Sequence, residues 1–159
     1  MLDRKFSCCF TGHRQLPPEQ IKKISKNLKK AIISLIKQGV YCFMAGGALG
    51  FDTLAAQAVL ALKKKYPHIK LMLVLPSKDQ TKGWSVQNIK IYEDIKKQCD
   101  HYIYTSKDYN PGCMHKRNRS LVDHTSHCVC YLTRETGGTA YTVKYARSQG
   151  IEVVNLAEQ

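Results

Sequence analysis

The sequence predicts an α/β fold of three layers, Rossmann-like and doubly wound, with a mostly parallel sheet of about six strands covered by helices on both faces. Three observations lead to this prediction. Short apolar runs alternate along the chain with segments whose apolar residues recur at every third or fourth position. Glycine-rich turns follow several of these runs. No internal repeat or linker interrupts the alternation, and parallel strands require helical crossovers of this kind.

The first predicted strand covers residues 5–10, an apolar stretch without helical periodicity. Pro17 and Pro18 then begin a helix, because proline is favoured in the first turn. Gly39 ends this helix. Its apolar face consists of Ile21, Ile24, Leu28, Ile32 and Leu35.

Residues 40–44 form the second predicted strand. We expect Asp52 to cap the helix that follows, because a carboxylate at that position satisfies free N–H groups and complements the helix dipole. Pro67 ends the helix, and residues 69–75 form the third predicted strand.

The second half of the chain repeats this alternation. We predict helices over residues 84–99, 114–123 and 138–149, and strands over residues 101–104, 128–132 and 151–154. In a sheet of this type, ligands bind beyond the carboxyl ends of the strands, near the point where the strand order reverses.

Length and composition predict one domain, residues 1–159. The chain has 159 residues, of which 43% are hydrophobic and 23% charged, as in an ordinary globular domain. No apolar run approaches the roughly 20 residues of a membrane span. The first residues lack the pattern of a cleaved export signal. We therefore expect a cytoplasmic protein with no membrane partner.

The balance of charge is strongly basic. The 25 Lys and Arg residues exceed the 12 Asp and Glu residues, for a formal net charge of +13, and this favours anionic partners. Many lysines fall between the apolar positions of the first helix, however, where they would form a solvated face. These residues are Lys22, Lys23, Lys26, Lys29, Lys30 and Lys37. The charge therefore predicts weak, nonspecific binding of nucleic acid.

The seven cysteines indicate core packing rather than disulfides or metal binding. Five of them lie within apolar runs, where a free cysteine behaves as a small hydrophobic residue: Cys8, Cys9, Cys42, Cys128 and Cys130. Cys113, His115, His124 and His127 are four potential zinc ligands in one stretch, but their spacing matches no paired-cysteine motif. We predict no metal site.

Glycine-rich or polar turns follow three of the predicted strands. They contain Thr11, Gly12, His13 and Arg14 after the first, Gly46, Gly47, Gly50 and Asp52 after the second, and Gly137, Gly138 and Thr139 after the fifth. Glycine lets an oxyanion approach the backbone, and the following helix supplies N–H donors. Each glycine pair could also be only a tight turn. Two pairs at one edge of a sheet favour a shared phosphate site.

Polar side chains near this edge suit an anionic ligand. Arg14 and Arg117 offer planar guanidinium groups to phosphate, and His13 can exchange a proton near neutral pH. Asn118 lies on the predicted helix 114–123 where its polarity favours a ligand contact.

These motifs together resemble the SLOG superfamily, and within it the small stand-alone bacterial proteins of the YpsA and YspA type. The similarity rests on the segments 10–14, 46–56, 116–118 and 137–139, which occur in the same order and cover nearly the whole chain. It implies a Rossmann-like fold with a nucleotide-type ligand at the glycine-rich edge. More distant relatives include the Lonely Guy phosphoribohydrolases and the DNA-processing protein DprA. Relatives commonly self-associate, so the resemblance also implies a homo-oligomer as an alternative to a monomer.

One difference from the phosphoribohydrolases bears on activity. In those enzymes glutamates follow the Gly-Gly-x-Gly-Thr turn, whereas Ala140, Tyr141 and Thr142 stand here. Asp52 and Glu135 are the remaining candidates for a catalytic carboxylate. The first hypothesis is therefore a module that binds a nucleotide or an ADP-ribose-like compound without a further cofactor. A nucleotide N-glycosidic hydrolase and a single-strand nucleic-acid-binding protein are the alternatives. A strand would need aromatic residues on which its bases stack, and the candidates are Trp84, Tyr102, Tyr104 and Tyr109.

Overall fold

A computed structural model describes residues 3–159 and contains one six-stranded parallel sheet in the order β4-β3-β2-β1-β5-β6. The strands are β1 (Ser7–Gly12), β2 (Cys42–Ala45), β3 (Lys70–Leu75), β4 (His101–Tyr104), β5 (His127–Tyr131) and β6 (Glu152–Asn155). The helices are α1 (Ile21–Lys37), α2 (Phe51–Leu62), α3 (Val86–Gln98), α4 (Cys113–Asp123) and α5 (Gly138–Ser148). The predicted Rossmann-like fold is confirmed. Met1 and Leu2, which the predicted domain includes, lie outside the described residues.

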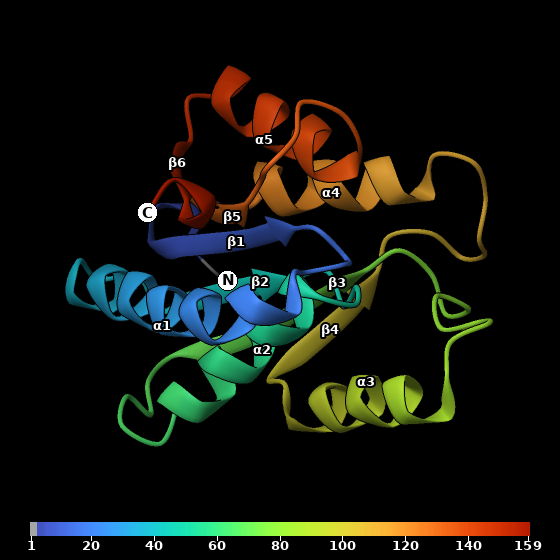
Figure 1. Cartoon of the computed structure of the whole chain (residues 1–159), viewed down its shortest axis with the longest axis horizontal. Helices are drawn as coiled ribbons and strands as arrows, with labels where there is room; N and C mark the ends of the chain where they lie inside the picture. The colour runs from blue at the N-terminus through green and yellow to red at the C-terminus, as the bar shows by residue number, and fades with distance from the viewer. Residues whose placement is uncertain (1–2) are drawn as a thin grey trace.

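The helices form two layers around the sheet (Figure 1). Helices α1, α2 and α3 cover one face, and α4 and α5 cover the other. The chain passes from β4 at one edge back to β5, which pairs with the central strand β1. The strand order therefore reverses between β1 and β5, so a ligand crevice is expected beyond their carboxyl ends.

Alternating side chains of each strand supply the two cores. In β1, Cys8 and Phe10 pack toward the layer of α1 to α3, whereas Cys9 packs toward α4 and α5. Cys42, Cys128 and Cys130 also lie in the second core, and no more than 1% of the surface of any of the five strand cysteines is exposed. Their predicted role as packing residues is confirmed.

Helix boundaries follow local capping. Helix α3 begins at Val86, two residues later than predicted, because the Ser85 side chain accepts a hydrogen bond from Asn88 N and caps the helix. The predicted cap of α2 is wrong: Gly50 is the N-cap and Asp52 lies inside the first turn, buried. Positive φ at Gly50 lets the chain turn sharply into α2, which begins before Asp52.

All five helices described above pack against the sheet. Across residues 3–159, none is both long enough and apolar enough to cross a membrane.

Candidate ligand-binding site

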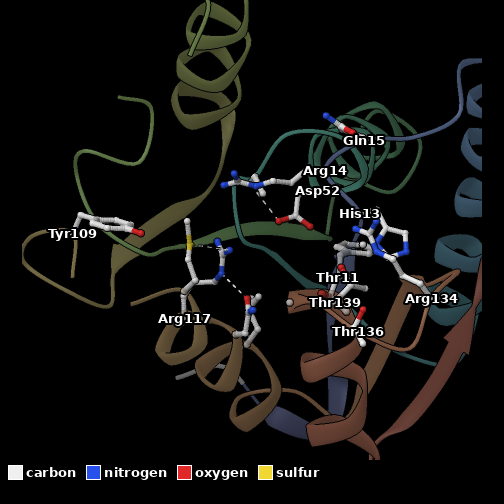
Figure 2. A pocket seen from close by; sticks show the side chains of 17 residues that line it. Thr11, His13, Arg14, Gln15, Asp52, Tyr109, Arg117, Arg134, Thr136 and Thr139 are labelled. Carbon is white, nitrogen blue, oxygen red and sulfur yellow. Dashed lines mark hydrogen bonds between the residues drawn. The ribbon is translucent and has the colours of Figure 1, made fainter. Parts of the chain in front are cut away.

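A polar cavity of about 600 Å³ lies beyond the carboxyl ends of β1 and β5, where the strand order reverses (Figure 2). Its wall is formed by the turn after β1, the loop from β5 into α5, the start of α2, and α4 with the loop before it. Among the predicted site residues it is lined by Thr11, Gly12, His13, Arg14, Asp52, Arg117, Asn118, Gly138 and Thr139. The fold thus brings together residues from distant parts of the sequence.

Arg117 is a buried cation in this wall, with 5% of its surface exposed. Its Nη1 donates a hydrogen bond to the backbone carbonyl of Gly46, and its Nε donates to Asn118 Oδ1 at 2.8 Å. Nη2 lies 3.7 Å from the sulfur of Met114. Burial lowers the pKa of Arg117 while the charge of Asp52 raises it. The guanidinium is therefore held rigidly, and the charge of Asp52 is its principal compensation.

Asp52 lies beside the loop between β2 and α2, the loop whose Gly46 carbonyl Arg117 binds. Its Oδ2 accepts a hydrogen bond from the backbone N–H of Ala48 at 3.3 Å, which closes the loop between β2 and α2. Burial raises the pKa of Asp52 to about 6, although the charges of Arg117 and Arg14 oppose that rise. A Cβ built on Gly46 would lie 2.4 Å from Arg117 Nη1 and 3.0 Å from Asp52 Oδ2. Glycine at position 46 therefore lets the two charged groups flank the backbone.

His13 connects the turn after β1 to the loop after β5. Its Nε2 accepts a hydrogen bond from Thr133 N at 2.9 Å, and the ring meets Tyr131 edge to face. Burial, with a contribution from the charge of Arg134, lowers the pKa of His13. An imidazole that accepts at Nε2 and is held neutral carries its proton on Nδ1. These contacts give His13 a positioning role at the edge of the cavity.

The beginning of α5 is open toward the cavity. The N-cap Gly137 has φ of 101° and supplies no side-chain hydrogen bond to the first turn. Gly138 has no other residue within 4 Å of the position of a Cβ, and Thr139 beside it is buried. Free N–H groups at this helix end therefore face the cavity without side-chain cover.

The glycines after β2 serve the loop rather than the cavity wall. Gly46, Gly47 and Gly50 are absent from the lining residues, as is Gly137. A Cβ on Gly47 would lie 2.6 Å from Leu75 Cδ2, and one on Gly50 would lie 2.2 Å from the carbonyl oxygen of Arg14. These glycines allow the close approach of backbone segments that places Asp52 and Arg117.

The two candidate catalytic carboxylates lie in different environments. Asp52 is buried in the cavity wall, whereas Glu135 is exposed and does not line the cavity. The loop after β5 presents the charge of Arg134 to the cavity instead. Within residues 3–159, no three or more His, Cys, Asp or Glu side chains are grouped so that they could hold a metal ion.

Sequence reasoning missed several residues of the wall. Arg134, Thr136 and Gln15 line the cavity, together with Tyr109 and Met114 from the segment before and at the start of α4. Arg134 and Thr136 could have been found, because they follow β5 directly and thus lie at the carboxyl end of a central strand. As an aromatic residue, Tyr109 is a candidate for stacking on a single strand, but its place in a long loop outside regular structure did not assign it to this edge.

Comparison with known families identifies the family of the chain. Residues 9–153 match the YspA SLOG family, and this match covers the whole sheet except the first two residues of β1 and the last two of β6. The chain belongs to this family. The SPbeta prophage-derived protein YoqJ of Bacillus subtilis is 33% identical over 138 residues, which cover 79% of this chain and 81% of YoqJ. A UPF0398 protein of Bacillus pumilus is 29% identical over 131 residues, covering 80% of this chain and 70% of that protein.

Two solved structures share the fold of this SLOG-family chain. DNA processing protein A (DprA) of Streptococcus pneumoniae superposes with a TM-score of 0.69 at 17% identity, covering 94% of this chain and 49% of that one. DprA of Helicobacter pylori, described by its single-stranded DNA binding mode, superposes with a TM-score of 0.65 at 15% identity, covering 94% of this chain and 64% of that one. The chain thus spans about half to two thirds of the DprA chains.

Proposed function

We propose that this SLOG-family chain forms a single domain, residues 1–159, that binds a nucleotide or an ADP-ribose-like compound at the cavity beyond β1 and β5. The observation that carries the proposal is the excess of fixed positive charge there. Arg14, Arg117 and Arg134 line the cavity, and Asp52 is the one carboxylate in its wall. A phosphate group would offset this imbalance.

The geometry adds backbone donors to the arginines. Gly138 and Thr139 begin α5 at the cavity, and an anion at a helix N-terminus gains both N–H hydrogen bonds and a favourable dipole. The volume of about 600 Å³ is within the range of sites for small ligands. Thr11, Thr136 and Asn118 supply hydroxyl and amide groups that suit a ribose.

Isothermal titration calorimetry tests this proposal with three probes: AMP, ADP-ribose and ribose 5-phosphate. We expect binding that weakens at least about tenfold in Arg134→Gln, since a hydrogen bond to a charged group is lost. Arg147→Gln in the last turn of α5 is the matched control, because Arg147 does not line the cavity. Absence of binding by all three probes, or equal weakening in the two variants, would refute the proposal.

A second candidate is binding of single-stranded nucleic acid. The structural likeness to DprA favours it, because the Helicobacter pylori protein binds single-stranded DNA. The same arginines would then contact backbone phosphates, and the high net charge of +13 would assist association.

A further inference from the structure

A second cavity, of about 480 Å³, adjoins the proposed phosphate site. It lies between the segment after β3 and the loop that leads into α4. Arg14, Tyr109 and Met114 line both cavities, so the two share a wall and one ligand can extend from the first into the second.

A tryptophan side chain distinguishes the second cavity from the first. Trp84 lines it on one side, half-buried and held edge to face against Tyr92 with 5.6 Å between ring centroids. Tyr109 lines it as well and is 62% exposed, so a large part of its surface remains free for contact. Planar side chains of this kind bind planar ligands by stacking.

Gln80 adds an unused hydrogen-bond acceptor. This residue lines the second cavity and is 6% exposed, and its Oε1 is buried with no hydrogen-bond partner. Its Nε2 donates to the carbonyl oxygen of Gly46 at 3.2 Å. Because a carbonyl oxygen only accepts, this bond fixes which end of the amide faces Gly46. A buried acceptor without a donor is costly, and a ligand N–H would satisfy it.

The charges around this cavity are mixed. Asp79 lies in its wall, and Asp79 Oδ1 accepts a hydrogen bond from Ser77 Oγ at 2.6 Å. Lys82 and Arg14 are the cations. Two cations and one carboxylate line this cavity, whereas three arginines and one carboxylate line the first, so the smaller excess of positive charge makes the second cavity less suitable for phosphate.

We propose that the second cavity is the base-binding end of the site, where Trp84 and Tyr109 stack on a nucleobase and Gln80 accepts a hydrogen bond from its exocyclic amino group. This inference rests on the proposed function, since the phosphate of the same ligand occupies the first cavity. It narrows the ligand to a nucleotide whose base carries an amino group, such as an adenine nucleotide. An oxo group in that position would face Gln80 Oε1 with a second acceptor.

Trp84 is the only tryptophan in the chain, so its fluorescence reports directly on the second cavity. The full chain is titrated with AMP, IMP and ribose 5-phosphate, by fluorescence and by calorimetry. We expect AMP to quench Trp84 and ribose 5-phosphate to leave its emission unchanged. AMP should bind at least about fivefold more tightly than ribose 5-phosphate, the lower bound of what one stacked base contributes. IMP should bind more weakly than AMP.

Variants separate the base from the phosphate. Tyr109→Leu should weaken AMP at least about fivefold more than it weakens ribose 5-phosphate, and Tyr109→Phe should restore AMP affinity. Tyr102→Leu is the control, because Tyr102 is an exposed tyrosine, 42% accessible, that lines neither cavity. Gln80→Met should abolish the preference for AMP over IMP.

The outcomes distinguish the two proposals. If AMP and ribose 5-phosphate bind equally and Tyr109→Leu changes neither, the phosphate site stands and the base-binding cavity is refuted. If Tyr109→Leu weakens both probes equally, Tyr109 acts through the fold or the phosphate end of the site rather than on the base, and the inference is wrong. If neither probe binds, the proposed function fails and this inference fails with it.

Discussion

His13 Nε2 accepts a hydrogen bond from the backbone N–H of Thr133 at 2.9 Å, although the two residues are 120 positions apart in the chain. The bond ties the turn after β1 to the loop after β5, on either side of the point where the strand order reverses. Arg134 follows Thr133 directly, so His13 helps to place an arginine in the cavity wall.

Replacing this histidine should therefore cost stability and affinity together. We expect His13→Ala to lower the free energy of unfolding by about 1 kcal/mol, the usual net value of a hydrogen bond. His13→Gln should recover part of the loss, because glutamine offers an acceptor of similar reach. Urea unfolding measures the effect. His68→Ala, at an exposed position, serves as control, and an equal loss in that variant would argue against the tie.

Asp52 predicts an unusual dependence of stability on pH. Its folded pKa, about 6, is above the ordinary value of 3.8, so the folded state holds a proton that the unfolded state releases. The free energy of unfolding should consequently fall as pH rises from about 4 to about 6. Each pKa unit corresponds to about 1.4 kcal/mol, so the loss is at most about 3 kcal/mol.

Comparison of the parent with Asp52→Asn isolates this effect. The lowered pKa of His13 acts in the opposite direction, since stability is lost as pH falls below the ordinary histidine value of 6.5, but it acts equally in both proteins. The difference in unfolding free energy between parent and variant should change between pH 4 and 7. A difference independent of pH would show that the carboxylate is not buried as described.

Two glycine substitutions should affect different properties, one the affinity for the ligand and the other the stability of the fold. Gly138→Val adds atoms in open space at the start of α5, so it should cover the N–H groups and weaken AMP at least about tenfold while the protein stays folded. The backbone at Gly47 has a positive φ, and a Cβ there would lie 2.6 Å from Leu75 Cδ2. Gly47→Val should therefore lower the free energy of unfolding by about 2 kcal/mol or more. Calorimetry and thermal unfolding together separate these effects; a folded Gly138→Val with parental affinity would place the phosphate elsewhere.

The alternation of strands and helices could be predicted from sequence because each strand is a short apolar run between turn residues. Strand β4 shows how little signal suffices: three of its four residues are exposed, yet His101–Tyr104 was predicted with the correct bounds. The order of the strands in the sheet could not be predicted in this way, because the pairing of β1 with β5 depends on contacts between distant segments.

The glycine-rich edge of the sheet could also be predicted, but which of its residues face the cavity could not. Gly46 and Gly47 form a glycine pair typical of a phosphate-binding turn. The positions where their side chains would lie are nevertheless filled by Arg117 and Leu75. Asp52 has the composition of a helix cap and instead lies buried in the first turn, because Gly50 begins the helix. A shift of one or two residues in the end of a turn therefore decides whether its glycines and carboxylate face a ligand.

Hydrolysis of a nucleotide at its N-glycosidic bond should be negligible. Ala140, Tyr141 and Thr142 stand after the glycine turn where the phosphoribohydrolases have glutamates, and Asp52, the one carboxylate in the cavity wall, accepts a hydrogen bond from the backbone N–H of Ala48. The carboxylate that would stabilise an oxocarbenium-like transition state is therefore missing from the start of α5. Release of free base from a panel of nucleoside monophosphates measures the activity. Robust release that is lost in Asp52→Asn, with Glu135→Gln unchanged, would promote the hydrolase alternative over the binding module.

Binding of single-stranded nucleic acid should be weak and strongly dependent on salt. The lysines of α1 are largely exposed and lie on the face of the sheet opposite α4 and α5, and none of them lines the two cavities. Charge spread in this way attracts a strand without giving it a defined path. Each neutralised phosphate steepens the dependence of log affinity on log salt by about 0.7, so a contact with several phosphates should nearly vanish at physiological salt.

Fluorescence anisotropy of a labelled oligonucleotide at low and physiological salt measures this dependence. Lys29→Gln, on the exposed face of α1, should reduce the slope slightly and lower affinity for every sequence alike. Tyr109→Leu should leave oligonucleotide binding unchanged, because the stacking cavity accepts a single base and the next aromatic residue beyond Trp84, Tyr92, is buried. Tight binding that persists at physiological salt and is lost in Tyr109→Leu would instead mean that the base-binding cavity belongs to a strand, and single-strand binding would then become the leading function.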